Sequence, residues 1–194
     1  MKNSFIALFQ FRLGAAFFAL LTVFGTAGLS ACAETPTATR PGASQASAPA
    51  TPTALGIHHL KFLVSDVDKS LAFYEAAFGV KRIAEFDHRR NGALFGVILA
   101  FPGIGTLLEL RLDPAGAQSQ KGFDPITLTV GGVADLEKWK AHFQAKGLLH
   151  SPVLVGLVGW LVAVEDPDGR RIRLYTNQTH GPELTPSWDS PWVK

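Results

Sequence analysis

Apolar and polar residues follow the pattern of one strand, one helix and three further strands, and this pattern occurs twice between residues 56 and 176. The first copy predicts a strand over 57–64, a helix over 67–78, and strands near 80–86, 94–101 and 106–112. The second copy predicts a strand over 125–130, a helix over 135–145, and strands near 148–150, 157–164 and 172–176. A single crossover followed by antiparallel hairpins indicates an α+β domain of two tandem βαβββ modules, residues 56–114 and 124–176.

Local signals mark where these elements begin and end. Asp66 can cap the first helix, and Gly79 follows its last apolar position. Asn91-Gly92 and Pro102-Gly103 predict turns between strands. Asp166-Pro167-Asp168-Gly169 suits a type I turn, with Pro second and Gly fourth. Arg170 and Arg171, directly after this turn, are expected to face solvent.

The first 31 residues have the pattern of an export signal. Lys2 and Arg12 lie near the start of an uncharged apolar stretch over 13–29, and small residues precede Cys32. This arrangement resembles the lipobox of bacterial lipoproteins, which implies cleavage before Cys32 and lipidation of its sulfur. The alternative is an uncleaved anchor with an incidental cysteine. Lipidation would place the protein in the cell envelope, facing the periplasm or the exterior, anchored to a membrane.

Two further segments lie outside the repeat. Residues 32–55 consist mostly of Ala, Thr, Pro and Ser without apolar periodicity, which predicts a disordered tether. Residues 177–194 contain Trp188, Trp192 and several prolines, so a regular helix is not expected there. We expect the tryptophans to pack against the domain; contact with a partner chain or with lipid headgroups is the alternative.

Charge and cysteine content exclude several classes of protein. The formal net charge is only +2, with basic and acidic residues dispersed, so no nucleic-acid partner is expected. One cysteine cannot form an intrachain disulfide or a cysteine-rich metal site. The chain has no glycine-rich phosphate loop between a strand and a helix, which disfavours nucleotide binding.

Two motifs resemble those of a known superfamily. His59-Leu-Lys-Phe-Leu-Val-Ser-Asp66, followed by Ser70-Leu-Ala-Phe-Tyr74 and Gly79, is similar to the opening module of vicinal oxygen chelate (VOC) proteins. Glu165-Asp-Pro-Asp-Gly169 with Ile172-Arg-Leu-Tyr175 is similar to their closing hairpin. The superfamily contains glyoxalases, extradiol dioxygenases, epimerases and bleomycin resistance-like antibiotic-binding proteins. The resemblance implies that the two modules form a cupped, partly open β-barrel.

The resemblance also implies a divalent metal held by four side chains, of which only two are present. His59 and Glu109 occupy the two ligand positions of the first module, and both are suitable ligand types. The corresponding positions of the second module hold Pro125 and Arg173. Proline has no donor atom and arginine is cationic, so no metal cofactor is expected. The alternative is a bound Zn, Ni, Fe or Mn ion.

Without a metal, a cation is needed to neutralise Glu109. We expect Arg173 to face Glu109 across the cup and to pair with it, with His59 nearby as a donor or acceptor. Trp160 is expected to line the same ligand site. Each has an alternative role in structure only: a core histidine, a structural ion pair and a core aromatic.

Three functions are consistent with these residues. The first is a membrane-tethered protein that binds a small organic molecule through His59, Glu109, Arg173 and Trp160, without the catalytic metal of its relatives. The second is a metal-dependent enzyme, a glyoxalase-type lyase or isomerase or a dioxygenase, whose catalytic residues the sequence does not identify. The third is a structural or interaction module. Pairing of modules between chains, common in the superfamily, leaves a homodimer open.

Overall fold

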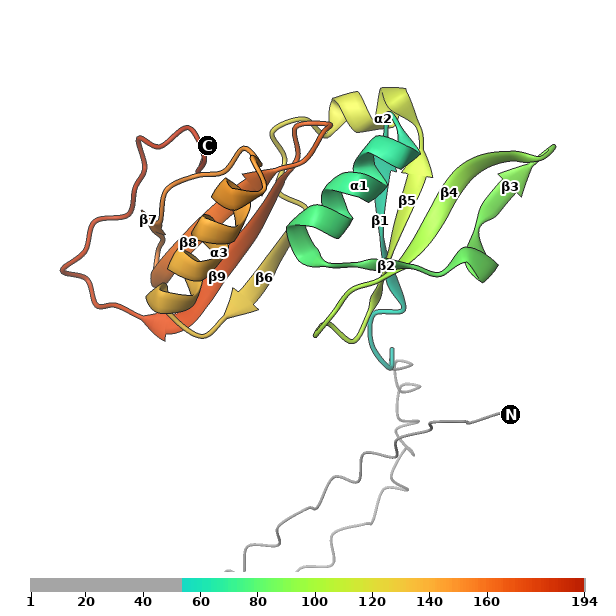
Figure 1. Ribbon diagram of the computed structural model, residues 1–194. Helices are drawn as coiled ribbons and strands as arrows, with labels where there is room; N and C mark the ends of the chain where they lie inside the picture. Colours follow the sequence, from blue (N-terminus) through green and yellow to red (C-terminus); the bar gives the residue numbers. More distant parts are fainter. Residues whose placement is uncertain (1–53, 194) are drawn as a thin grey trace, which may run out of the picture. The chain divides into compact units, whose positions relative to one another are not determined.

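The structure, a computed structural model, describes residues 54–193 (Figure 1). The first module contains five strands, one long helix and a 3₁₀ turn: β1 (His59–Val64), α1 (Val67–Phe78), β2 (Lys81–Arg82), η1 (Ala84–Phe86), β3 (His88–Arg90), β4 (Ala93–Ala100) and β5 (Leu107–Leu112). A short helix, α2 (Pro114–Ser119), follows it. The second module consists of β6 (Ile126–Val130), α3 (Val133–Ala145), β7 (Leu154–Val155), β8 (Gly159–Glu165) and β9 (Arg171–Thr179).

Each module forms its own mixed sheet, and the two sheets repeat the same topology. The first sheet has the order β1-β5-β4-β2, with β3 also paired to β4, and the second has the order β6-β9-β8-β7. In both, the first strand runs parallel to the last strand of its module. The predicted α+β fold of two βαβββ modules is therefore confirmed.

The ends of α1 agree with the sequence signals. The Asp66 carboxylate accepts the backbone N–H of Lys69 at 2.9 Å, which satisfies one of the free donors in the first turn. Gly79 ends the helix in the left-handed region at φ 65°, and its N–H donates to the carbonyl of Glu75. The helix bounds predicted over 67–78 are confirmed.

Other elements depart from the prediction where apolar periodicity is short. Of the strand expected near 80–86 only β2 is formed, because the 3₁₀ turn η1 interrupts pairing with β4, which resumes at β3 beyond the predicted range. The strand expected near 148–150 is a single bridge at His150, and the paired strand β7 begins later. Helix α2 has no apolar stripe and was missed; its first turn is capped by Asp113.

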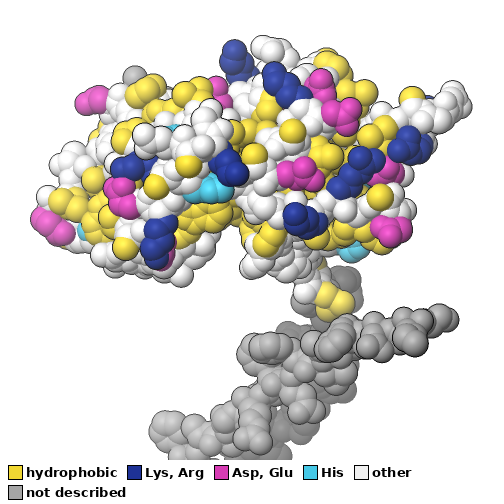
Figure 2. Space-filling view, viewed as in Figure 1, with side chains coloured by type: hydrophobic (Ala, Val, Ile, Leu, Met, Phe, Trp, Pro, Cys, Tyr) yellow, Lys and Arg dark blue, Asp and Glu magenta, His cyan; other side chains and the backbone are white. Residues whose placement is uncertain are grey.

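One hydrophobic core extends through both modules. Phe78 at the end of α1 contacts Trp139 and Phe143 of α3, with ring centroids 5.9 and 6.0 Å apart. His142 of α3 donates its Nε2–H to the carbonyls of Ala76 and Ala77, at 3.0 and 3.2 Å. Figure 2 shows hydrophobic side chains between the modules and interspersed charges on the visible surface.

Arg170 forms a buried polar link between the modules, which corrects the expectation that it faces solvent. Its side chain is 0% exposed. It donates from Nε and Nη2 to Asp166 Oδ2, at 2.8 and 2.6 Å, and from Nη1 to the Leu63 carbonyl of β1. Tyr74 of α1 donates to the same carboxylate oxygen at 2.9 Å, and the guanidinium lies 5.2 Å from the Phe62 ring centre.

This link sets the protonation state of Tyr74. Burial and the neighbouring Asp166 carboxylate raise the pKa of Tyr74 well above its usual value, so the phenol stays a neutral donor. Asp168 extends the link, because it lies 3.3 Å from Arg170 and accepts the backbone N–H of Ser65. Side chains of the β8–β9 turn are therefore bonded to both β1 and α1.

Residues 54–193 include no helix that is long and apolar enough to span a membrane. The predicted signal over 1–31, the lipidated Cys32 and most of the predicted tether over 32–55 lie outside the described residues.

Replacing Arg170 with methionine should destabilise the protein by about 3–5 kcal/mol, since Asp166 would remain buried without its counter-charge. The measurement is the free energy of unfolding from urea denaturation. Arg89→Met is the control, because that side chain is half exposed at 52%, and it should cost less than about 1 kcal/mol. Equal losses in the two variants would show that the buried link does not hold the modules together.

Candidate functional site

One face of the first sheet carries a cluster of ionisable side chains. The parallel register places Lys61 of β1 opposite Glu109 of β5, and alternate residues on each strand share a face. His59, Lys61, Glu109 and Arg111 are therefore on one face, while Phe62, Val64, Leu108 and Leu110 belong to the core on the other. Antiparallel pairing places Ile98 of β4 beside Glu109.

The Glu109 carboxylate is buried at the centre of this cluster, with an exposed fraction of 2%. Arg111 donates its Nε–H to Oε1 at 2.7 Å and also contacts it through Nη2. Lys61 Nζ and His59 Nε2 each lie 3.4 Å from Oε2, and His88 Nδ1 lies 3.4 Å from Oε1. Four basic side chains thus surround one carboxylate.

Opposing effects act on the ionisation of Glu109. Burial raises the pKa of this carboxyl. The Arg111 hydrogen bond and the charges of Arg111, Lys61 and His88 lower it, and together their effect is larger than that of burial. The net pKa lies below the ordinary value of 4.5, so Glu109 is ionised at neutral pH.

Gly96 makes room for this arrangement. A Cβ atom at this position would lie 3.0 Å from His88 Nδ1 and 3.3 Å from Arg111 Nε. Because glycine has no Cβ, the side chains of His88 and Arg111 can both lie over β4 here, with His88 Nδ1 and Arg111 Nη2 3.0 Å apart. Phe95 supports them from the side, with the Arg111 guanidinium 5.0 Å from its ring centre.

An open pocket of about 560 Å³ lies beside the cluster. This volume is within the range of small-molecule sites. Three imidazoles, three carboxylates and three apolar side chains form its wall: His58, His59, Glu85, Phe86, Asp87, His88, Ile98, Leu107 and Glu109. The Asp87 carboxylate is held by Arg82 and Arg89, which lower its pKa chiefly through the Arg82 hydrogen bond.

Arg173 occupies the predicted repeat position on the second sheet. Thr127 of β6 pairs with Arg173 of β9 as Lys61 pairs with Glu109, which also makes Pro125 the counterpart of His59. However, the described residues contain no Glu109–Arg173 ion pair. Arg173 instead lies 2.7 Å from Asp124 Oδ2.

The expected pair is replaced because each charge has a nearer partner. Arg111 lies two residues from Glu109 on the same strand face, and Asp124 lies two residues before β6, the strand that pairs with β9 at Arg173. Glu109 is neutralised by cationic side chains, as expected from the sequence, but these are Arg111 and Lys61. Alternation along β5 could have identified Arg111, and the β1–β5 register was needed to identify Lys61.

Trp160 does not lie beside Glu109. It is half-buried on β8, packs against the shared hydrophobic core, and contacts His180 edge-on at 5.0 Å. His59 does lie in the pocket wall, where its Nδ1 is 3.0 Å from Nδ1 of His58.

The residues present do not fit the metal centre that the superfamily resemblance implies. Two of the four implied ligand positions hold Pro125 and Arg173. The remaining carboxylate is Glu109. Its two oxygens already face the Arg111 guanidinium and the Lys61 ammonium, so they are not open to a metal ion. Within residues 54–193, no three His, Cys, Asp or Glu side chains are grouped closely enough to hold an ion.

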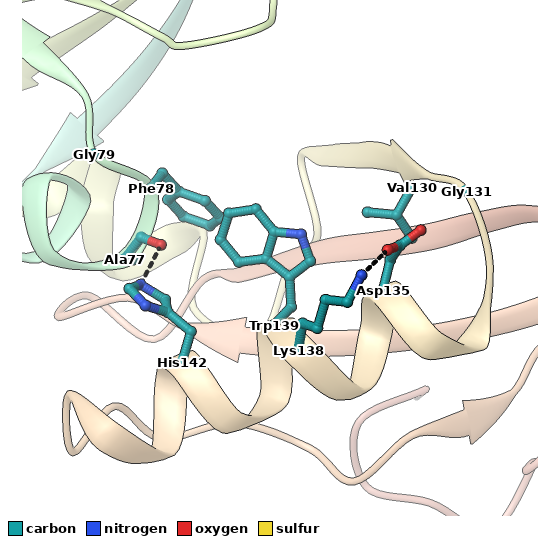
Figure 3. A pocket seen from close by; sticks show the side chains of 9 residues that line it. All are labelled: Ala77, Phe78, Gly79, Val130, Gly131, Asp135, Lys138, Trp139 and His142. Carbon is teal, nitrogen blue, oxygen red and sulfur yellow. Dashed lines mark hydrogen bonds and ion pairs between the residues drawn. The ribbon is translucent and has the colours of Figure 1, made fainter.

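A second hollow, about 580 Å³, lies between α1 and α3 (Figure 3). Phe78 and Trp139 form its apolar wall, and the His142 bond to Ala77 closes one end. At the other end, Lys138 pairs with Asp135 at 3.0 Å and lowers the pKa of that carboxyl. Phe78, Trp139 and His142 make the contact between the modules here, and the sequence predicted them as helix residues without predicting that contact.

Comparisons with known proteins agree with this fold. Residues 56–174 match the model of the Glyoxalase/Bleomycin resistance protein/Dioxygenase superfamily. A putative ring-cleaving dioxygenase, MhqA of Bacillus subtilis (strain 168), is 28% identical over 129 residues, which are 63% of this chain and 40% of that protein. The chain therefore matches less than half the length of this curated relative.

Two solved structures illustrate the similarity. TnmS3, an antibiotic binding protein from Streptomyces sp. CB03234, is 22% identical with a TM-score of 0.53, over 66% of this chain and 100% of that one. The fosfomycin resistance protein FosX from Listeria monocytogenes is 14% identical with a TM-score of 0.53, over 65% and 96%. At these identities the similarity is one of fold.

Replacing Glu109 with glutamine should flatten the dependence of stability on pH. The lowered pKa stabilises the fold above the ordinary value of 4.5, and this contribution is lost as pH falls through the folded-state pKa. The difference in free energy of unfolding between the wild type and Glu109→Gln should therefore shrink between about pH 6 and pH 3. Glu85→Gln, at an exposed carboxylate of the same pocket, is the control and should parallel the wild type. A constant difference across this range would contradict the assignment.

Proposed function

Because the chain belongs to the Glyoxalase/Bleomycin resistance protein/Dioxygenase superfamily, we propose that it binds a small organic ligand in the first-module pocket without the metal used by enzymes of this superfamily. The observation that carries the proposal is the Glu109 carboxylate, which already has Arg111 and Lys61 as counter-charges beside an open pocket. A site of this kind offers hydrogen-bonding groups and apolar surface but no open metal position.

The pocket wall supports binding of a molecule with both polar and apolar parts. His59 and His88 present imidazoles that can donate or accept hydrogen bonds, and they are held in place by Glu109. Phe86, Ile98 and Leu107 supply the apolar contacts. The fold is compatible with such a role, since TnmS3, which has the same fold, is described as an antibiotic binding protein.

The proposal includes a location. Export followed by lipidation of Cys32 would anchor the folded domain at a membrane of the cell envelope, with residues 33–55 as the spacer. In that position the protein would bind its ligand outside the cytoplasm. Replacement of Cys32 by serine should abolish lipidation, because serine has no sulfur to carry the lipid, and mass spectrometry of the membrane fraction should show the lipid mass only on the wild type.

A metal-dependent dioxygenase is the second candidate. It is favoured by the match to the putative ring-cleaving dioxygenase MhqA and opposed by the residues at 125 and 173. Metal analysis of the purified full-length chain separates the two functions. We expect less than about 0.1 equivalent of any transition metal, because catalytic ions commonly need three protein ligands. Stoichiometric zinc, nickel, iron or manganese, with a lower Tm after EDTA, would favour the enzyme.

Ligand binding should raise the Tm of the protein in the presence of EDTA, since ligands stabilise the folded state they bind. A thermal-shift panel of small polar aromatic compounds would identify a probe, and its Kd would then be measured for two matched variants. Phe86→Ala, at a 54% exposed residue in the pocket wall, should weaken binding at least fivefold. Phe123→Ala, at a 56% exposed residue outside that wall, should change it less than twofold. Equal effects, or no compound bound, would oppose the proposal.

A further inference from the structure

The C-terminal segment crosses one face of the second sheet. At one end, Ser187 exchanges two hydrogen bonds with Val155 of β7, at 2.9 and 3.1 Å. At the other end, the carbonyls of Pro191 and Trp192 accept hydrogen bonds from Arg171 and Arg173 of β9. Since the strand order is β9-β8-β7, a segment bonded to β7 at one end and to β9 at the other spans the width of β8. This segment is called the C-terminal strap below.

The surface beneath the strap is the face opposite α3. Val162 and Val164 of β8 belong to the core on the α3 side, so Leu161 and Ala163 point to the other side. Both are nevertheless buried. Arg171 and Arg173 lie on this same face, because they pair with Glu165 and Ala163 of β8.

The strap places an aromatic ring and two acceptors on this pair of arginines. The Arg171 guanidinium lies 5.3 Å from the Trp192 ring centre, and its Nη1 donates to the Pro191 carbonyl at 2.5 Å. Arg173 Nη2 donates to the Trp192 carbonyl at 3.5 Å. The Nε atoms of both arginines are buried without a hydrogen-bond partner among the described residues. These guanidiniums therefore retain unused donors under the strap.

An external molecule could satisfy these donors better than the strap does. A carboxylate forms stronger bonds to guanidinium than a neutral carbonyl, because the acceptor is charged and can bind two N–H groups at once. A planar aromatic ring would replace the Trp192 contact with Arg171. Glu165 Oε2 lies 3.9 Å from Arg171 Nε, too far for a hydrogen bond, and Asp124 contacts Arg173 through Nη1 at 2.7 Å, so neither Nε has a hydrogen-bond acceptor among the described residues.

We propose that the Arg171–Arg173 face is a second ligand site, which takes planar aromatic carboxylates and which the C-terminal strap occupies as an internal ligand. Arg173 is the repeat counterpart of Glu109. The equivalent sheet face therefore carries an open pocket in the first module and is covered by the strap in the second. Binding of the aromatic carboxylate displaces the whole strap, from Trp192 and the two carbonyls to the Ser187 bonds with Val155. This inference goes beyond the proposed function, because it does not require the first-module pocket.

Affinity for 2-naphthoate, measured by calorimetry on the full-length chain, tests the competition. Trp192→Ala removes the ring of the internal ligand and should tighten binding at least fivefold. Trp188→Ala is the matched control: that side chain is exposed and is not among the aromatic partners of the arginines, so the change should be less than twofold. Adding Arg173→Met to Trp192→Ala should weaken binding at least tenfold. Unchanged or weaker binding by Trp192→Ala would overturn the proposal.

Hydrogen exchange on the wild type supplies a test that needs no variant. Saturating 2-naphthoate should increase exchange across residues 187–193, where the Ser187 amide loses its bond to Val155. Unchanged exchange with 2-naphthoate bound would overturn the displacement. Phe86→Ala distinguishes the two proposals, because it should weaken ligands of the first-module pocket and leave this increase in exchange unaltered.

Discussion

The buried contact between Arg170 and Asp166 is the interaction on which the arrangement of the two modules depends. Its members come from the β8–β9 turn, yet the guanidinium also bonds to β1 and the carboxylate to Tyr74 of α1. Two buried charges are tolerable here because each is paired and hydrogen-bonded on several sides. This geometry requires the second module to dock in one orientation, which in turn positions both sheet faces.

The two sheet faces have diverged in charge while keeping one register. The position that holds Glu109 in the first module holds Arg173 in the second, and each is paired with a side chain of opposite charge. A repeat with equivalent strand positions thus presents two different surfaces. One is an open pocket lined by imidazoles, and the other is a pair of guanidiniums beneath the end of the chain.

Much of the fold followed from local patterns, but the chemistry of the site depended on contacts between distant segments. The repeat and the helix over 67–78 were predictable from periodicity and turn residues, while the superfamily resemblance placed Glu109 and Arg173 at equivalent positions of the two modules. The burial of Arg170 was not, because a residue directly after a turn has no periodicity to assign it a face. Pairing of Glu109 with Arg173 was wrongly expected because strand alternation assigns a residue to a face but does not say which opposite charge is nearest.

The shared aromatic core has a consequence for how the molecule loses its structure. Phe78 of the first module is packed among Trp139 and Phe143 of the second, and His142 is bonded to the carbonyl end of α1. Separating the modules would expose these rings and leave helix carbonyls without their donor. We therefore expect the two modules to unfold together in one cooperative transition.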